Sequence, residues 1–275
     1  MFVPADSERK LVKALQINAD AVILDWEDAV RADKKEVARR QTKDLLLEKD
    51  SIKPAIFIRC NPVSTPDFSE DAMVLKELTP RGVVISKCQS SADVHRLDTV
   101  LNETDSAQKI RLYPLIESPT GILNALSIVN SSSRISGLAF GAEDFALEMG
   151  ITTTSGEIEL LYARSALVIT CRAAGLEALD SPCLALHDLD NLKAHILRSR
   201  NLGFTGKLSI HPSQVPLINE LLYPDESEIK QARKILSAYA EEDSGATIVD
   251  GTMVDMAVVR RAKRILEMLD GGERN

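Results

Sequence analysis

Eight short apolar runs alternate along this chain with segments of helical periodicity, and this alternation constrains the fold more than any other feature. The runs are rich in Val, Ile and Leu, as a parallel sheet buried on both faces requires. They lie at residues 2–3, 21–24, 55–58, 83–86, 111–116, 137–140, 178–179 and 208–210. Because a helical segment separates most neighbouring runs, we predict an α/β fold of the (β/α)8 TIM barrel type.

The segments between the runs have apolar residues at helical spacing and are expected to be helices. They cover residues 7–15, 34–47, 91–101, 119–129, 157–174 and 189–200. Gly175 and Gly203 follow the last two, where glycine commonly ends a helix. A doubly wound open sheet is the alternative architecture, but no GxGxxG or GxxxxGK[ST] motif follows the first run.

The length of 275 residues suits one large α/β barrel, and the barrel pattern occupies residues 1–222. Residues 223–275 exceed what eight strand–helix units need. They contain two further helical patterns, at 229–239 and 255–269, with a glycine-containing stretch at 244–251 between them. We therefore expect a catalytic barrel and a C-terminal extension that caps the barrel or reaches a neighbouring subunit.

Charge and cysteine usage narrow the class of protein. The formal net charge is −8, whereas a nucleic-acid-binding domain usually carries a basic surface. No apolar run approaches the roughly 20 residues that span a bilayer, and we expect no signal peptide before the first run. The four cysteines form no CxxC pair and suit reduced thiols. We expect a cytoplasmic protein that binds neither nucleic acid nor membrane.

Two carboxylates follow two consecutive apolar runs. Glu117 comes directly after the run at 111–116, and Asp144 follows the run at 137–140 within the sequence FGAEDF. If these runs are neighbouring parallel strands, the two carboxylates meet at the C-terminal edge of the sheet, where barrel enzymes have their active sites. Such a pair suits Mg²⁺. Glu117 as a helix-start carboxylate and Glu143 in place of Asp144 are the alternatives.

Several motifs follow one another in a fixed order over nearly the whole chain. They are LDWEDAV at 24–30, IRCN at 58–61, LIESPTG at 115–121, FGAEDF at 140–145, GFTGKLSIHP at 203–212 and VDGTMVD at 249–255. With them the chain resembles the citrate lyase β-subunit-like branch of the HpcH/HpaI aldolase superfamily, which includes citryl-CoA, malyl-CoA and citramalyl-CoA lyases.

The resemblance implies a carbon–carbon lyase that cleaves a 3-hydroxyacyl-CoA into an acyl-CoA and an α-keto acid by retro-Claisen chemistry. Glu117 and Asp144 match the ligands of Mg²⁺, with Mn²⁺ as a substitute. Arg59 matches a catalytic, substrate-binding arginine, because a guanidinium suits a carboxylate or a thioester enolate. Glu27 and Asp28 resemble an acidic pair that supports metal-bound waters and the arginine. A structural ion pair of Arg59 with Glu27 or Asp28 is the alternative.

Further residues gain a role from the same resemblance. Asp255 matches an acid/base that enters the site of an adjacent subunit, which implies a homotrimer or a dimer of trimers; a helix cap is its other interpretation. Lys87 contributes positive charge that attracts the substrate. Glu117 contributes to substrate binding indirectly, through the metal ion that it holds. Lys207 and His211 resemble positions near the CoA phosphates and adenine, or are a solvated lysine and a turn histidine.

Departures from the family pattern leave the substrate open. Trp26 stands where leucine is usual and is expected to add bulk behind the site and narrow it. A malate-synthase-like condensation with thioester hydrolysis and a CoA-independent pyruvate aldolase are alternatives on the same site. A non-catalytic subunit of an acyl-carrier lyase complex is the alternative from a different class.

Overall fold

The computed structural model describes residues 1–48, 54–103, 110–240 and 245–272. The chain divides into two compact units, Met1–Ile218 and Asn219–Asn275. Among the described residues, none of the helices combines the length and the apolar character that a membrane span needs.

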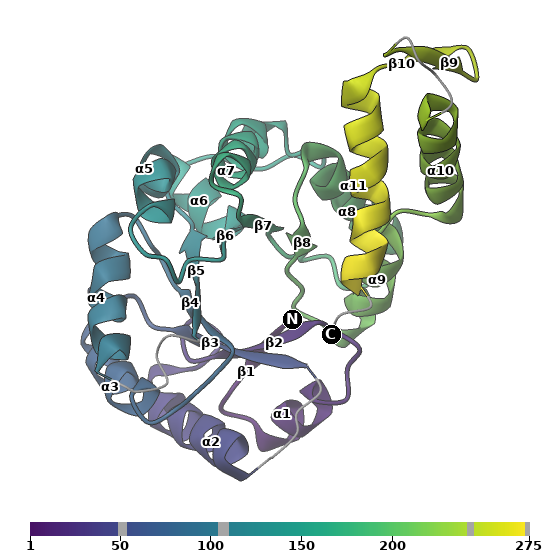
Figure 1. The fold of residues 1–275 in the computed structure, drawn as a ribbon. Helices are drawn as coiled ribbons and strands as arrows, with labels where there is room; N and C mark the ends of the chain where they lie inside the picture. Colours follow the sequence, from purple (N-terminus) through teal and green to yellow (C-terminus); the bar gives the residue numbers. More distant parts are fainter. Residues whose placement is uncertain (49–53, 104–109, 241–244, 273–275) are drawn as a thin grey trace. The chain divides into compact units, whose positions relative to one another are not determined.

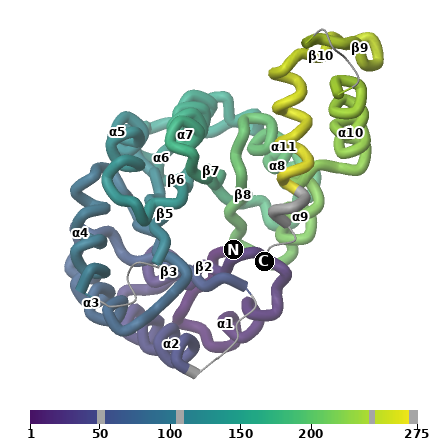
Figure 2. The backbone as a smooth tube through the Cα atoms, in the orientation of Figure 1, coloured from purple at the N-terminus to yellow at the C-terminus, as the bar shows by residue number. Residues whose placement is uncertain are grey.

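The first unit is an α/β fold built on an eight-stranded parallel sheet. Each strand pairs with the next in chain order, and the sheet curls so that helices surround its outer face (Figure 1). The strands are β1 (Phe2–Pro4), β2 (Ala21–Asp25), β3 (Ala55–Cys60), β4 (Gly82–Ile85), β5 (Arg111–Ile116), β6 (Gly137–Phe140), β7 (Glu177–Asp180) and β8 (Gly206–Lys207). After β8 the chain returns to the N-terminus (Figure 2), where the Phe2 N–H donates to the Ser209 carbonyl at 2.8 Å.

Helices follow the strands. They are α1 (Glu8–Ala14), α2 (Lys35–Glu48), α3 (Pro66–Leu75), α4 (Ser91–Asn102), α5 (Pro119–Val129), α6 (Ala142–Met149), α7 (Leu161–Ala174), α8 (Leu189–Leu202) and α9 (Val215–Leu222). Successive residues of β2 alternate between two apolar clusters, as the two-residue period of a strand requires. Val22 and Leu24 pack with helix residues such as Leu11, whereas Ile23 joins Leu208 in the cluster inside the sheet.

Two predicted elements have different bounds. The eighth strand pairs at Gly206–Lys207 rather than at 208–210, because β7 already ends at Asp180 and leaves the later residues without a ladder partner. Leu208 still points into the inner cluster. The predicted helix at 157–174 begins only at Leu161, after a short 3₁₀ turn, because Glu157 has a φ of +49°, outside the right-handed helical region.

The second unit contains two helices and a hairpin, α10 (Glu226–Ala240), β9 (Thr247–Val249), β10 (Thr252–Val254) and α11 (Met256–Gly272). The predicted stretch 244–251 begins at a residue outside the described ones, and its later part forms the hairpin. Asp250 and Gly251 have φ values of +51° and +75°, which suit the tight turn of a two-residue hairpin. Val249, Val254 and Val259 form the apolar core of this unit.

Candidate active site

Glu117 and Asp144 meet at the C-terminal edge of the sheet. Glu117 follows β5 and is only 4% exposed, and Asp144 lies in the first turn of α6, directly after β6. The two carboxyls lie close enough to affect each other's charge, and the Lys87 N–H donates to Glu117 Oε1 at 3.2 Å. Glu143 is exposed. Of the two acidic residues in the FGAEDF sequence, Asp144 is therefore the one beside Glu117.

The environment of Glu117 disfavours a negative charge on its carboxyl group in addition to that on Asp144. Burial raises the pKa of Glu117 to about 9, and the negative charge of Asp144 acts in the same direction. The site also depends on Gly141, because a Cβ atom there would lie 2.5 Å from Glu117 Cγ. A divalent cation bound to the two carboxyls would offset the negative charge that burial disfavours here.

Arg59, the last but one residue of β3, is held by an aspartate on the neighbouring strand. Asp25 at the end of β2 is its register partner, and it accepts from Arg59 Nε at 2.8 Å and Nη2 at 2.5 Å. The Arg59 side chain also lies over the Phe2 ring, with Cζ 4.8 Å from the centroid. This geometry fixes the guanidinium plane and leaves Nη1 directed toward Glu27 Oε2 at 3.0 Å. Arg59 therefore pairs with Glu27, one of the two partners expected from the sequence, and with Asp25, which was not expected.

Glu27 is 3% exposed, and burial raises its pKa. Among the described residues its Oε2 atom has no aligned hydrogen-bond donor, although Arg59 Nη1 is within ion-pair distance. Lys87 Nζ lies 3.3 Å from the other carboxylate oxygen. A water molecule bound to a metal at the Glu117–Asp144 pair could donate a hydrogen bond to this buried oxygen of Glu27.

The donor set fits a hard cation. No group of three or more His, Cys, Asp or Glu side chains within the described part of the chain is arranged to hold a metal ion by itself. A cation at Glu117 and Asp144 would thus take its remaining ligands from water and substrate, as Mg²⁺ commonly does. Structural zinc sites, in contrast, have four protein ligands.

Lys207 does not have the exposure that its predicted role at the CoA phosphates needs. Its side chain is 0% exposed, and Nζ lies 2.7 Å from Asp180 Oδ2. The two residues are register partners on β8 and β7, so their side chains meet inside the protein. The ammonium is enclosed by its own chain, and we correct the assignment accordingly: Lys207 belongs to the buried network described next.

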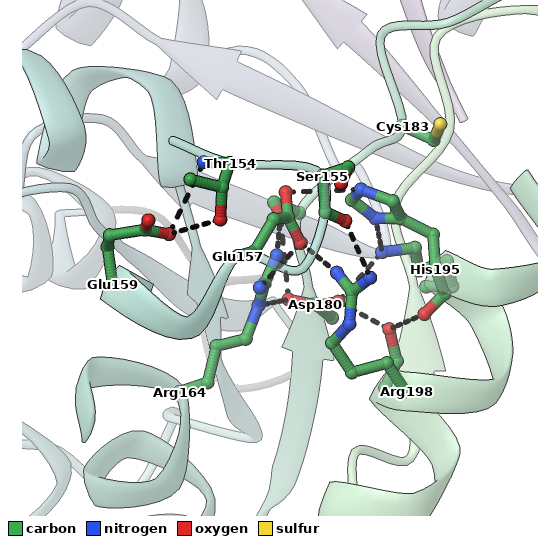
Figure 3. A network of polar contacts seen from close by, with 12 residues as sticks. Thr154, Ser155, Glu157, Glu159, Arg164, Asp180, Cys183, His195 and Arg198 are labelled. Atoms are coloured by element: carbon green, nitrogen blue, oxygen red, sulfur yellow. Dashed lines mark hydrogen bonds and ion pairs between the residues drawn. The ribbon is translucent and has the colours of Figure 1, made fainter. Parts of the chain in front are cut away.

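This network links β7, β8, α7 and α8 (Figure 3). Arg164 bridges Asp180 at 3.0 Å and Glu157 at 2.7 Å, and His195 contacts Glu157 at 3.1 Å. The ring closes at His195 Nδ1, 3.4 Å from Lys207 Nζ. Burial raises the pKa of Asp180, but Lys207 and Arg164 hold it well below its ordinary value. Likewise, His195 and Arg164 outweigh burial and lower the pKa of Glu157 to about 2.

Two further residues differ in how the structure places them. His211 is exposed and precedes a 3₁₀ turn, where its Nδ1 atom accepts from the Ser213 N–H at 3.2 Å. Its role toward CoA stays a prediction. Trp26 is fully buried, and its Nε1–H donates to Thr42 on α2 at 2.8 Å. The indole therefore packs among the core residues under α2, so the expectation that it narrows the site is wrong.

Asp255 lies in the second unit, directly before α11. Its carboxylate accepts from the backbone N–H groups of Ala257 at 2.9 Å and Val258 at 3.0 Å, which makes it the cap of that helix. A cap of this kind leaves one carboxylate oxygen available, so capping and proton transfer are compatible. The catalytic role remains a prediction.

Known proteins resemble this chain over most of its length. The sequence profile of the HpcH/HpaI aldolase/citrate lyase family matches residues 1–212. The citrate lyase subunit beta of Leuconostoc mesenteroides subsp. cremoris is 30% identical over 98% of this chain and 91% of its own length. The L-malyl-CoA/beta-methylmalyl-CoA lyase of Rhodobacter capsulatus is 32% identical over 98% of this chain and 93% of its own.

A solved structure extends the similarity to three dimensions. The protein CitE from Mycobacterium tuberculosis, in complex with magnesium, acetoacetate and coenzyme A, superposes with a TM-score of 0.83 at 28% identity. It covers 97% of this chain and 96% of that one. Because the profile spans most of the chain and the relatives match over nearly their full lengths, the predicted resemblance is confirmed, and the chain belongs to the HpcH/HpaI aldolase/citrate lyase family.

Proposed function

We propose that this protein is a Mg²⁺-dependent lyase that cleaves a 3-hydroxyacyl-CoA of the malyl-, citramalyl- or citryl-CoA type into an acyl-CoA and an α-keto acid. The chain is a carbon–carbon lyase of its family. The observation that carries the finer proposal is the Glu117–Asp144 carboxyl pair beside Arg59 at one edge of the sheet. Magnesium and coenzyme A in the complex of the Mycobacterium tuberculosis protein support the choice of ligands.

The proposal includes a closed (β/α)8 barrel. Its support is the hydrogen bond from the Phe2 N–H on β1 to the carbonyl of Ser209 directly after β8. Closure would bring the ends of β1, β2 and β3 to the same rim as those of β5 and β6. Arg59 and the carboxyl pair would then face one substrate from two sides.

Each side chain has a defined task in this proposal. Glu117 and Asp144 would hold Mg²⁺, and the chemistry that the bound ion supplies is polarisation of a substrate oxygen and fixed orientation of the acid half. Arg59, fastened to Asp25 through Nε and Nη2, presents its remaining N–H groups to the thioester oxygen, where negative charge develops. Asp255 of an adjacent subunit would take the hydroxyl proton and return a proton to the acyl product.

We also infer that the protein is an oligomer of identical chains, a homotrimer or a dimer of trimers. The support is a set of exposed apolar side chains on α5, α6, α7 and the 3₁₀ turn Ile158–Leu160 before α7. The three helices are neighbours in the fold (Figure 1). The set includes Leu123, Leu126, Leu147, Ile158, Tyr162 and Ile169, each at least 59% exposed. The α5 segment contains no charged residue, and an apolar surface of this kind is typical of contacts between copies.

The test is a panel of malyl-CoA, citramalyl-CoA and citryl-CoA, each incubated with the protein in the presence and in the absence of Mg²⁺. We expect one of them to release an α-keto acid only when Mg²⁺ is present. If no substrate gives a metal-dependent keto acid, the proposal is wrong. Release of free CoA together with the keto acid would indicate that thioester hydrolysis follows cleavage.

A further inference from the structure

Lys87 is a strained residue at the candidate site. It follows β4 with a φ of +49°, in the left-handed region that a residue with a side chain adopts only when its surroundings hold it there. Its backbone N–H donates to Glu117 Oε1 at 3.2 Å, and its ammonium lies among carboxylates at the same edge of the sheet. The backbone conformation thus directs both positively polarised groups of one residue toward the acidic cluster.

The ammonium is shared by three carboxylates and is tightly bound to none. Lys87 Nζ lies 3.3 Å from Glu27 Oε1, 3.6 Å from Asp28 Oδ2 and 3.9 Å from Asp144 Oδ1. Charge-assisted N–H···O bonds are usually about 2.7–2.9 Å long, so all three contacts are loose. The side chain is also 39% exposed, so part of it borders solvent and not protein. A shared, loosely held cation at this point neutralises the cluster without fixing it.

We propose that the Lys87 ammonium is an internal counter-ion that occupies the place of a divalent cation at Asp144, and that metal binding releases it. The inference rests on the proposed function, because it takes Glu117 and Asp144 as the metal ligands. A divalent cation on Asp144 repels an ammonium a few ångströms away, since like charges at such distances repel each other appreciably near a protein surface. Lys87 then keeps Glu27 and Asp28 and becomes available to the anionic acid half of the substrate.

This exchange has a consequence for the order of binding. While Lys87 is engaged with Asp144, its ammonium is neutralised and attracts a substrate carboxylate weakly. After the metal binds, Asp144 no longer takes part in this neutralisation, so the ammonium, still beside Glu27 and Asp28, attracts a substrate carboxylate more strongly than before. The metal therefore binds before the substrate, and Lys87 lowers the affinity of the protein for the metal.

The first test measures Mg²⁺ affinity alone, by titration calorimetry without substrate. We expect Lys87→Gln to bind Mg²⁺ roughly five-fold more tightly than the wild type, the equivalent of one partly exposed ion pair. Lys87→Arg keeps the charge and should bind like the wild type. Lys43→Gln is the matched control, because Lys43 is 36% exposed and pairs with Glu77 away from these carboxylates. Unchanged or weaker Mg²⁺ binding by Lys87→Gln overturns the inference.

The second test uses the wild-type protein and does not depend on any variant. Lysines are acetylated briefly with acetic anhydride, with and without Mg²⁺, and the modification of each lysine is measured by mass spectrometry. Modification of Lys87 should rise when Mg²⁺ is present, whereas that of Lys43 should not change; an unchanged or reduced Lys87 signal overturns the release. A wild type that binds no Mg²⁺ overturns the proposed function as well. Metal-dependent keto acid release without either Lys87 effect overturns this inference alone.

Discussion

Replacement of Asp255 by Asn and by Ala separates its predicted acid/base role from its observed role as a helix cap. The carboxylate accepts from two backbone N–H groups, those of Ala257 and Val258. Alanine removes both bonds and should lower the free energy of unfolding by about 1 kcal/mol. Asparagine is an equally good cap, so Asp255→Asn should keep the wild-type stability. Neither amide nor methyl can move the proton, and loss of a general acid/base typically costs about 10²–10⁴ in rate.

The assay follows keto acid release from the best substrate of the panel, together with urea unfolding and Mg²⁺ titration. Both variants should lose kcat, and both should bind Mg²⁺ like the wild type. Asp225→Ala is the matched control, because Asp225 precedes α10 and accepts from the Glu228 N–H at 2.8 Å. It should lose stability to a similar extent and keep its kcat. If Asp255→Asn turns over like the wild type, Asp255 is a cap and the acid/base is another residue.

Three further predictions follow from single contacts. Gly141→Ala should lower Mg²⁺ affinity by about 10- to 100-fold in calorimetry, because its Cβ displaces Glu117; wild-type affinity would contradict this close approach. Lys207→Met should lower the free energy of unfolding in urea by about 3–5 kcal/mol, since it leaves Asp180 with one fewer buried partner; a loss below about 1 kcal/mol would show that the pair is dispensable. The free energy of unfolding of the wild type should fall as the pH drops from 4.5, the ordinary pKa of Glu157, toward about 2, its pKa in the folded protein. Glu157→Gln should make the free energy of unfolding depend less steeply on pH over this range. Equal pH dependence in the two proteins would show that the ion pairs of Glu157 are not the cause.

Most of the sheet was predictable because a strand that is buried on both faces has a continuous run of apolar residues in the sequence. The runs at 111–116 and 137–140 coincide with β5 and β6, and the other predicted strands from β1 to β7 shift by one or two residues. β8 was misplaced because its two paired residues are Gly206 and Lys207, which carry no apolar signal. Their pairing depends on the register with β7, a property of two segments rather than of one.

The short helices α3 and α6 have no comparably clear apolar pattern in the sequence. The eight-residue α6 begins within the FGAEDF sequence, whose acidic residues were assigned to a strand end. In α3 three positions are buried, Phe68, Asp71 and Leu75, and the buried aspartate interrupts the apolar pattern. Asp71 is buried because it accepts from Arg39 on α2 and from the Asn61 N–H after β3, contacts between segments far apart in the sequence.

The candidate site was predictable to the extent that it depends on which strands are neighbours. Glu117 and Asp144 meet because β5 and β6 pair, and that order followed from the alternation of runs and helices. Which acidic residue of the sequence DWED faces Arg59 could not be read in the same way. Both Asp25 and Glu27 contact Arg59, and the contact with Asp25 depends on a register in which Asp25 lies beside Arg59.

The same arrangement occurs twice along the edge of the sheet, with opposite outcomes. Asp25 with Arg59 on β2 and β3, and Asp180 with Lys207 on β7 and β8, are each an acid and a base at paired strand ends. A lysine or arginine side chain at such a position can have all its N–H donors bound within the protein, or it can keep some N–H donors available for a ligand. Arg164 from α7 reaches Asp180 and closes the second pair completely, so it stabilises the fold. Arg59 also has a second partner, because its Nη1 lies 3.0 Å from Glu27 Oε2. A guanidinium nevertheless carries more N–H donors in one plane than Asp25 and Glu27 accept, and these remaining donors make the first pair the one suited to chemistry.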